Sequence, residues 1–293
     1  MVEPSPSLTI GLPVYNGADY LDAALDSLLG QSYADFELII SDNASTDATE
    51  AIGRAAAAKD PRVTFRRNPH NLGLDGNFNL LVPLARGRYF KWATADDQLL
   101  PGYLERCVGV LEADPSVVLA YPRTTFVDGV GKLLDLHDPG WHLVSDDVSQ
   151  RLGYAIGATH FVNAVLGVIR TDALQRTRLH ASYPGGDLRL MAELSILGKF
   201  VEVQEMLYVR RIHAGSTGGN IGNVSWQRRY RSGSRPAVRG AFLRLMKHRA
   251  GIVVGAPIPL SRKLALLAQL GRETAYHWRR VVGEIVESVR RDP

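Results

Sequence analysis

The chain has 293 residues, of which 45% are hydrophobic and 22% are charged, as is usual for a soluble globular protein. Its single cysteine, Cys107, excludes an intrachain disulfide bond. The first residues do not follow the pattern of a signal peptide, and no apolar run reaches about 18 residues, so we expect no membrane-spanning helix.

The charge is distributed unevenly along the chain. Of the 34 lysine and arginine residues, 15 lie from Ser225 onward, where only 4 of the 30 acidic residues occur. The part before Ser225 is therefore net acidic, although the whole chain has a formal charge of +4. An acidic body followed by a basic section indicates different partners for the two parts.

Short apolar runs alternate with segments of helical periodicity in the first part of the chain. Strands are predicted at residues 8–14, 36–40, 63–65, 88–93 and 117–121. Helices are predicted between them at residues 20–29, 46–59, 76–85 and 101–113. This alternation is typical of βαβ units, and it predicts an α/β fold with a largely parallel sheet.

The rest of the chain is less regular. Residues 128–149 are rich in Gly, Asp and His and predict a long loop, a length typical of lids and binding loops. Further elements are predicted as a strand at 163–170, a helix at 187–197, a strand pair at 200–203 and 207–209, and helices at 224–249 and 260–290. The glycine-rich segment 215–222 separates the last two helices from the body.

Polar residues follow the first two predicted strands. Pro13 to Asn16 ends the first strand, and Ser41 to Asp47 ends the second. Ligands of parallel sheets bind at the carboxyl ends of the strands, where a carboxylate can accept hydrogen bonds from a base or a ribose. A turn with a helix N-cap is the alternative, because Asp, Asn, Ser and Thr all favour turns.

Two adjacent carboxylates, Asp96 and Asp97, follow the fourth predicted strand. Their mutual repulsion is relieved by a cation, and Mg²⁺ or Mn²⁺ prefers carboxylate oxygens and often bridges to a diphosphate. The alternative is a helix N-terminus stabilised by negative charge. Further along, Asp187 is a candidate general base or an N-cap, and His213 is a candidate metal ligand or an ordinary histidine.

Taken in order, these segments resemble family 2 glycosyltransferases with the GT-A fold. The resemblance rests first on LPVYNG at 12–17, SLLGQSY at 27–33 and FELIISDNASTD at 36–47. It continues through NLG at 71–73, ARGRY at 85–89, the acids at 96–97, the Gly-Asp at 186–187, GKF at 198–200 and residues 211–216. It covers about residues 7–217, and its first blocks are the most specific.

The resemblance implies a GT-A fold with a Rossmann-like sheet flanked by helices, and a C-terminal helical extension. It implies a catalytic domain at 1–222, with nucleotide-sugar binding at 7–125 and acceptor and catalytic functions at 126–222, followed by a basic helical region at 223–293. The nucleotide-sugar contacts that it implies are Pro13, Tyr15, Asp42, Asn43, Asn71, Thr94 and Asp96.

The resemblance also implies roles in chemistry. Asp187 would be the catalytic base of an inverting transfer from a nucleoside diphosphate-sugar to a hydroxyl of a glycan or lipid-linked glycan. Asp96 and His213 would hold Mg²⁺ or Mn²⁺, with Asp97 as a further candidate. The chain departs from the family where Thr94 replaces the first aspartate of the Asp-x-Asp motif, so that the site loses one charge.

Other classes of protein are alternatives to this one. A catalytically silent sugar-nucleotide-binding or scaffold protein is the alternative, and Thr94 is its best support. The segment after the first strand is not the glycine-rich basic loop of nucleotidyltransferases, and neither Gly-x-Gly-x-x-Gly nor a P-loop occurs.

The composition of the basic C-terminal region indicates a partner that differs from those of the catalytic domain. Arginines at 228, 229, 231, 235 and 239 lie near Trp226 and Tyr230, a combination typical of helices that dock on anionic membrane surfaces. A solvated helical face is the alternative. We expect a cytoplasmic protein with peripheral contact at the inner face of the membrane, no nucleic-acid partner, and C-terminal helices that are a candidate dimer surface.

Overall fold

The computed structural model describes residues 5–158, 162–183, 185–213, 215–216 and 241–277. Four parallel strands form its N-terminal half: β1 (Leu8–Val14), β2 (Phe36–Asp42), β3 (Val63–Arg67) and β4 (Tyr89–Trp92). Every residue of β1, β2 and β4 is buried, as expected where both faces of a parallel sheet are covered. Because the strands are parallel, their carboxyl ends meet at one edge of the sheet.

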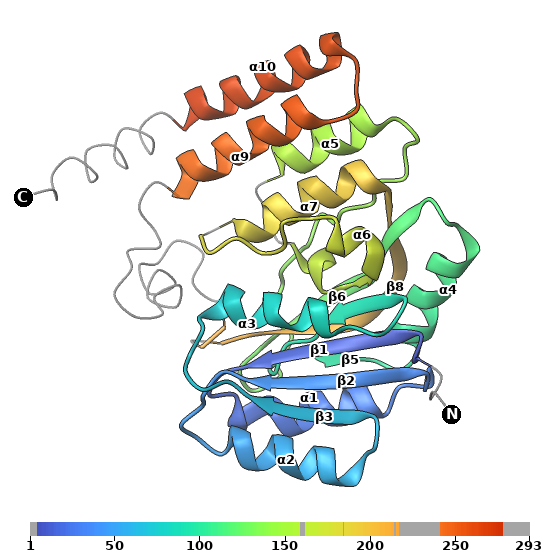
Figure 1. Ribbon diagram of the computed structural model, residues 1–293, viewed down its shortest axis with the longest axis vertical. Coiled ribbons are helices and arrows are strands. Elements are labelled where there is room, and N and C mark those ends of the chain that lie inside the picture. The colour runs from blue at the N-terminus through green and yellow to red at the C-terminus, as the bar shows by residue number, and fades with distance from the viewer. Residues whose placement is uncertain (1–4, 159–161, 184, 214, 217–240, 278–293) are drawn as a thin grey trace, which may run out of the picture.

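Helices cover both sides of these strands (Figure 1). They are α1 (Ala18–Leu29), α2 (Thr49–Lys59), α3 (Leu74–Leu81) with the 3₁₀ turn η1 (Val82–Leu84), and α4 (Tyr103–Ala113). α2 begins at Thr49, three residues later than predicted, because Ser45 and Thr46 lie in a loop that binds the end of β1. The four predicted helices are otherwise present.

The second half of the sheet differs from the prediction in three places. The strand predicted to end at 121 is β6 (Val117–Asp128), and the predicted strand pair is one strand, β8 (Lys199–Ile212). β6 and β8 pair in parallel along this length with register shifts near Arg123, and such long-range pairing is not visible in local periodicity. The strand predicted at 163–170 is a 3₁₀ turn, η2 (Asn163–Leu166), followed by β7 (Val168–Arg170).

The complete sheet has the order β3-β2-β1-β4-β7-β6-β8-β5, where β5 is Gln98–Leu99. Its pairings are parallel except β4 with β7, β6 with β7 and β5 with β8. The predicted fold class, a mostly parallel sheet flanked by helices, is confirmed. One helix, α5 (Val148–Gly157), was not predicted from the sequence, and the side chain of Asp147 caps its N-terminus by accepting the Ser149 N–H.

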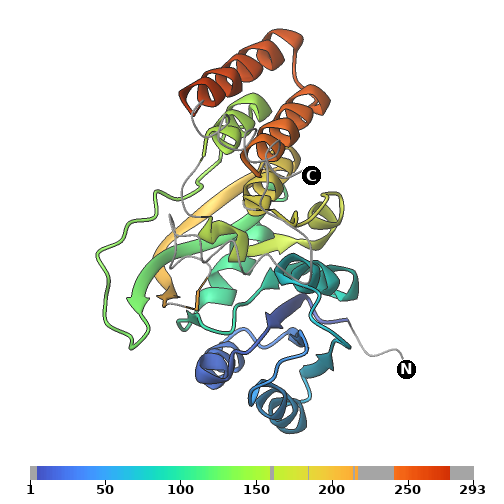
Figure 2. The same cartoon turned by 90° about the vertical axis from the view of Figure 1, so that its left-hand side faces the viewer.

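The remaining helices are α6 (Thr171–Gln175), α7 (Gly186–Leu197), α9 (Ala241–Gly255) and α10 (Leu260–Tyr276). α9 and α10 lie beyond α7, on its side away from the sheet (Figures 1 and 2). α9 packs on α7, and α10 packs on α9 and α5, so that Phe242, Val253 and Leu266 extend the same hydrophobic core as the sheet.

The predicted boundary near residue 222 and the arginine cluster at 228–239 lie outside the described residues, and the domain division stays a prediction. Within the described part of the chain, no helix has both the length and the apolar character needed to cross a bilayer.

Candidate active site

The loops that follow β1 and β2 are bound to each other. The backbone N–H of Asn16 donates to the Ser45 hydroxyl at 2.9 Å, and the N–H of Thr46 donates to the Asn16 side-chain oxygen at 2.8 Å. The N–H of Gly17 donates to the Thr49 hydroxyl at 2.9 Å. The polar residues that the sequence places after the two strands therefore fix one loop against the other.

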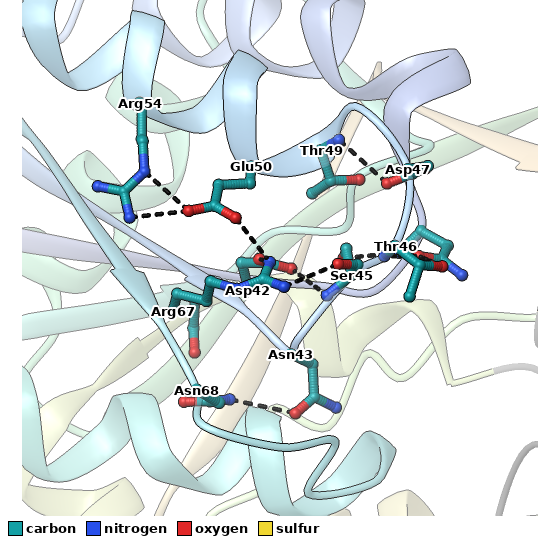
Figure 3. A network of polar contacts seen from close by, with 12 residues as sticks. Asp42, Asn43, Ser45, Thr46, Asp47, Thr49, Glu50, Arg54, Arg67 and Asn68 are labelled. Atoms are coloured by element: carbon teal, nitrogen blue, oxygen red, sulfur yellow. Dashed lines mark hydrogen bonds and ion pairs between the residues drawn. The ribbon is translucent and has the colours of Figure 1, made fainter.

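Asp42 lies at the centre of this arrangement and is fully buried (Figure 3). One carboxylate oxygen accepts the N–H of Ser45 at 3.0 Å, and the other is paired with the guanidinium of Arg67. Arg67 also donates to the Ser45 carbonyl at 2.9 Å and pairs with Glu50 at 3.2 Å. Both oxygens of Asp42 thus have protein partners, and its role in nucleotide binding stays a prediction.

Asn43 joins the loop after β2 to the loop after β3. Its amide nitrogen donates to the Asn71 side-chain oxygen at 2.9 Å and to the Gly73 carbonyl at 3.1 Å. Its side-chain oxygen accepts from the Asn68 amide at 3.1 Å and from the Leu72 N–H at 2.9 Å. The structure therefore brings Asn43 and Asn71 together, as expected of residues of one site.

Pro13 and Tyr15 differ in their access to solvent. Pro13 is buried within β1, whereas the Tyr15 side chain follows the strand and leaves the residue 50% exposed. Of the two, Tyr15 is the side chain that a nucleobase can reach from solvent.

The loop after β4 separates its two carboxylates. Asp97 is buried, and its side chain accepts hydrogen bonds from the Thr94 hydroxyl, the Tyr208 hydroxyl and, at 2.8 Å, the Arg211 backbone N–H. Burial and the charge of Asp96 raise the pKa of Asp97. Since both Asp97 oxygens are occupied by protein donors, the structure gives no support to Asp97 as a metal ligand.

Asp96 turns toward the end of β8. Its carboxylate accepts from Nε2 of His213 at 3.1 Å, and both side chains are partly exposed. Nδ1 of His213 faces the backbone N–H of Gly215 at 3.1 Å, so the neutral ring holds its proton on Nε2. The ring also lies against Tyr20, with 4.9 Å between the ring centroids.

The pair of Asp96 and His213 has the chemistry of a metal site. One carboxylate and one imidazole suit a first-row divalent ion such as Mn²⁺, and substrate phosphate and water complete such sites in many enzymes. In such a site, the carboxylate of Asp96 and the imidazole of His213 would hold the ion. Among the described residues, no group of three or more His, Cys, Asp or Glu side chains is arranged to hold a metal ion.

Asp187 lies in the first turn of α7 and is partly buried. Loss of solvation raises its pKa, although the Leu188 N–H and the positive charges of Arg210 and Arg249 oppose this shift. A carboxylate with a raised pKa is a better proton acceptor than an exposed one.

A second carboxyl group, Asp75, lies in the first turn of α3 and was missed by the sequence analysis. Burial and, secondarily, the charge of Asp187 raise the pKa of Asp75 to about 7, while Arg189 acts in the opposite direction. The sequence held one signal for it, because Asp75 comes two residues after the Asn71-Leu72-Gly73 block.

These loops occupy one edge of the sheet. A Cβ atom on Gly17, after β1, would lie 3.1 Å from the side chain of Ala95, the neighbour of Asp96. The charge of Arg210 on β8 acts on both Asp97 and Asp187. The ends of β1, β2, β4 and β8 therefore lie together, and the start of α7 is within reach of their charges. Arg67 and Tyr208, which help to hold these strand ends together, were not identified from the sequence, and Arg211 was identified only as part of the block at 211–216.

A mostly parallel sheet of this topology, with polar loops at its carboxyl edge, defines the GT-A class of glycosyltransferase folds. Residues 9–171 match the profile of glycosyl transferase family 2, and the chain belongs to that family. The resemblance to family 2 glycosyltransferases is confirmed, and so are the predicted fold and the predicted enzyme class.

Two curated relatives match most of this chain over a minor part of their own length. The chondroitin synthase of Pasteurella multocida (strain Pm70) is 28% identical over 76% of this chain and 22% of that protein. The hyaluronan synthase of Pasteurella multocida is 28% identical over 72% of this chain and 21% of that protein. The chain therefore spans about a fifth of the length of these two relatives.

Solved structures share the fold at low identity. S. aureus TarS 1–349 in complex with UDP-GlcNAc has a TM-score of 0.70 and 16% identity, covering 92% of this chain and 72% of that one. The mannosyltransferase PcManGT from Pyrobaculum calidifontis, in complex with GDP-Man and Mn²⁺, has a TM-score of 0.56 and 19% identity, covering 95% and 83%.

Proposed function

We propose that this chain transfers a sugar from a nucleoside diphosphate-sugar to a hydroxyl group of a glycan or lipid-linked glycan, with inversion at the anomeric carbon. The observation that carries the proposal is the pair of Asp96 and His213 on the same edge of the sheet as Asp187. The pair provides a place for a metal-bound diphosphate, and Asp187 provides a proton acceptor.

The donor would lie across the loops after β1, β2 and β4. Tyr15 is exposed toward solvent there, while the bonded network of Asp42, Asn43 and Asn71 holds the loops in position. Two structures with this fold contain UDP-GlcNAc and GDP-Man, which supports a nucleoside diphosphate-sugar as the donor class.

Asp96 and His213 would hold Mg²⁺ or Mn²⁺. When bound, such an ion offsets the negative charge that develops on the leaving diphosphate. The Mn²⁺ in the structure with PcManGT supports this assignment.

Asp187 would act as the general base. It takes the proton of the acceptor hydroxyl while the acceptor oxygen forms a bond to the anomeric carbon and the bond from that carbon to the diphosphate breaks. Attack from the face opposite the leaving group gives inversion. The partial burial of Asp187 and its raised pKa support this role.

Turnover of a donor panel tests the proposal. UDP- and GDP-hexoses are incubated with Mn²⁺ and glycan acceptors, and release of nucleoside diphosphate is measured together with the anomeric configuration of the product. We expect release with at least one donor, an inverted product, and loss of activity when EDTA is added. A rate unaffected by EDTA would remove the metal role of Asp96, and a retained configuration would remove inversion.

The catalytically silent alternative predicts a different result in the same assay. A silent protein would bind UDP or GDP but release no nucleoside diphosphate from any donor, with or without acceptor. Thr94, which replaces a charged residue of the family motif, is the feature that favours it.

The acceptor class is supported by two relatives that are named for synthesis of chondroitin and hyaluronan, both of which are glycans. Membrane contact is supported by α10, which exposes the apolar Leu260 and Leu264 and also the basic Arg262 and Arg272. Co-sedimentation with vesicles containing anionic lipid tests the contact, and equal sedimentation with neutral vesicles would contradict it. The dimer and the cytoplasmic location stay predictions.

A further inference from the structure

Asp97 connects the two candidate metal ligands through the backbone. It directly follows Asp96 in the chain, and its carboxylate accepts the N–H of Arg211, two residues before His213. The side chain of Arg211 makes a second contact with this loop, since its Nε donates to the backbone carbonyl of Asp96 at 3.2 Å. The loop after β4 and the end of β8 are thus joined twice beside the Asp96–His213 pair.

Two hydroxyl groups hold the other Asp97 oxygen. Both the Thr94 hydroxyl and the Tyr208 hydroxyl donate to Oδ2, so the oxygen has no lone pair directed to solvent. Tyr208 is 3% exposed, and its position on β8 is fixed because its neighbour in the sheet is Leu99 of β5. Water is therefore unable to replace the Tyr208 hydroxyl without a change in packing.

Below Tyr208 lies a further buried group. The ammonium of Lys91 on β4 is fully buried, donates to the Tyr103 hydroxyl at 3.1 Å, and lies 5.5 Å from the centre of the Tyr208 ring. Tyr103 and Tyr208 are in edge-on contact with 6.0 Å between centroids. The floor of the site is rigid, and its polar groups have partners within the protein.

We propose that Thr94, Asp97 and Tyr208 form a positioning bracket that sets the separation of Asp96 and His213 and so determines divalent metal affinity. This inference rests on the metal site of the proposed function. In the bracket, Thr94 acts as a hydrogen-bond donor to Asp97, and a hydroxyl group suits that place better than a carboxylate.

The bracket has a consequence for the family motif. Replacing Thr94 by aspartate restores the charge that the motif usually has, and a site that merely lacks a charge would then bind metal more tightly. In the bracket, the new carboxylate would instead face the buried carboxylate of Asp97 and repel it. We therefore expect Thr94→Asp to weaken metal binding.

Direct Mn²⁺ titration of the purified chain tests the bracket, with free Mn²⁺ counted by electron paramagnetic resonance in the absence and presence of UDP. Loss of an outer hydrogen-bond partner typically lowers metal affinity about 10- to 100-fold, and we expect at least the lower value for Tyr208→Phe and Thr94→Asp. Thr94→Ser keeps the hydroxyl and should stay within about twofold of the parent chain.

The matched control is Tyr121→Phe. Tyr121 is a buried tyrosine of β6 whose hydroxyl accepts from the backbone N–H of Trp141, and it pairs with Glu202 near the opposite end of β8. Loss of the Tyr121 hydroxyl should lower the melting temperature about as much as loss of the Tyr208 hydroxyl, without altering Mn²⁺ affinity.

Unchanged Mn²⁺ affinity in Tyr208→Phe, or tighter binding in Thr94→Asp, would overturn the bracket. Asp96→Asn separates this failure from that of the proposed function. If Asp96→Asn binds Mn²⁺ as the parent chain does, the metal site itself is wrong and the bracket falls with it; if Asp96→Asn loses binding while the bracket variants keep it, only the bracket is wrong.

Discussion

Two regions at the carboxyl edge of the sheet differ in how far their polar side chains are bonded within the protein. At the end of β2 and in the loop that follows it, Asp42 and Asn43 are buried and their polar atoms are bonded to other parts of the protein; this end of β2 and the loops after β1 and β2 are the first region. Around α3, α7 and the end of β8, Asp75 and Asp187 have raised pKa values, and Asp96 is partly exposed. Satisfied polar groups give rigidity, whereas perturbed and accessible ones are available for chemistry. The first region should therefore respond to mutation in stability, and the second in activity.

The largest effect is expected at Asp187. Asp187→Asn keeps the size of the side chain but removes the proton acceptor, and we expect kcat for sugar transfer to fall about 10³-fold, as for loss of a general base. Binding of UDP or GDP, measured by calorimetry, should persist because Asp187 lies outside the loops after β1 and β2.

Asp172→Asn is the control for this variant, because Asp172 is an exposed carboxylate in the first turn of another helix, α6. It should leave kcat unchanged. Full turnover in Asp187→Asn would reject Asp187 as the base. It would also contradict the expectation that mutations in the second region act on activity.

The next effect is one of stability in the first region. Arg67→Leu leaves the buried carboxylate of Asp42 without its cation, and removal of one partner of such a pair costs about 3 kcal/mol of unfolding free energy. Urea denaturation measures the loss. Arg54→Leu removes an exposed arginine that pairs with Glu50 and should cost no more than about 0.5 kcal/mol. Equal effects of the two variants would show that the Asp42 pair is not a stabilising contact.

In the second region, the raised pKa of Asp75 should make the stability of the chain depend on pH. The folded-state pKa of Asp75, about 7, lies above the usual value, so between about pH 4 and 7 the folded chain holds a proton that the unfolded chain releases. This contribution to stability is present below pH 4 and is lost as the pH rises to 7. Asp75→Asn has no such proton, and its stability relative to the parent chain should increase by about 2 kcal/mol between pH 5 and pH 8.

Urea unfolding of both chains at the two pH values checks this, with Asp19→Asn as the control for loss of an exposed charge in the first turn of α1. A stability difference between Asp75→Asn and the parent chain that is the same at both pH values would contradict the raised pKa of Asp75.

The sequence predicted the first region better than the second, and the reason lies in the strands. β1 and β2 are buried on both faces, so their apolar runs are visible locally, and the polar residues after them lie where parallel strands end. β6 and β8 are held by long-range pairing with register shifts, and neither strand alternates simply between buried and exposed residues, since β6 is mostly buried and β8 is mostly half-buried. The sequence placed Asp96 and Asp97 together but gave no means of telling that one is exposed and the other buried, because that depends on Tyr208 and Arg211 more than a hundred residues away.

The smallest effect is expected at Tyr15, the exposed aromatic residue of the otherwise closed first region. If a nucleobase stacks on its ring, Tyr15→Ala should weaken UDP or GDP binding about fivefold, the lower end for loss of an aromatic stacking partner. Tyr15→Phe keeps the ring and should bind as the parent chain does. Because half of the residue is already in contact with solvent, neither variant should alter the melting temperature appreciably. Calorimetric titration with each nucleotide measures the affinity. Equal binding by the alanine and phenylalanine variants would mean that the loops after β1 and β2 bind the donor through their backbone and buried polar groups alone. Tyr15 would then have no binding role of its own, and the first region would contribute to the site only through its rigidity.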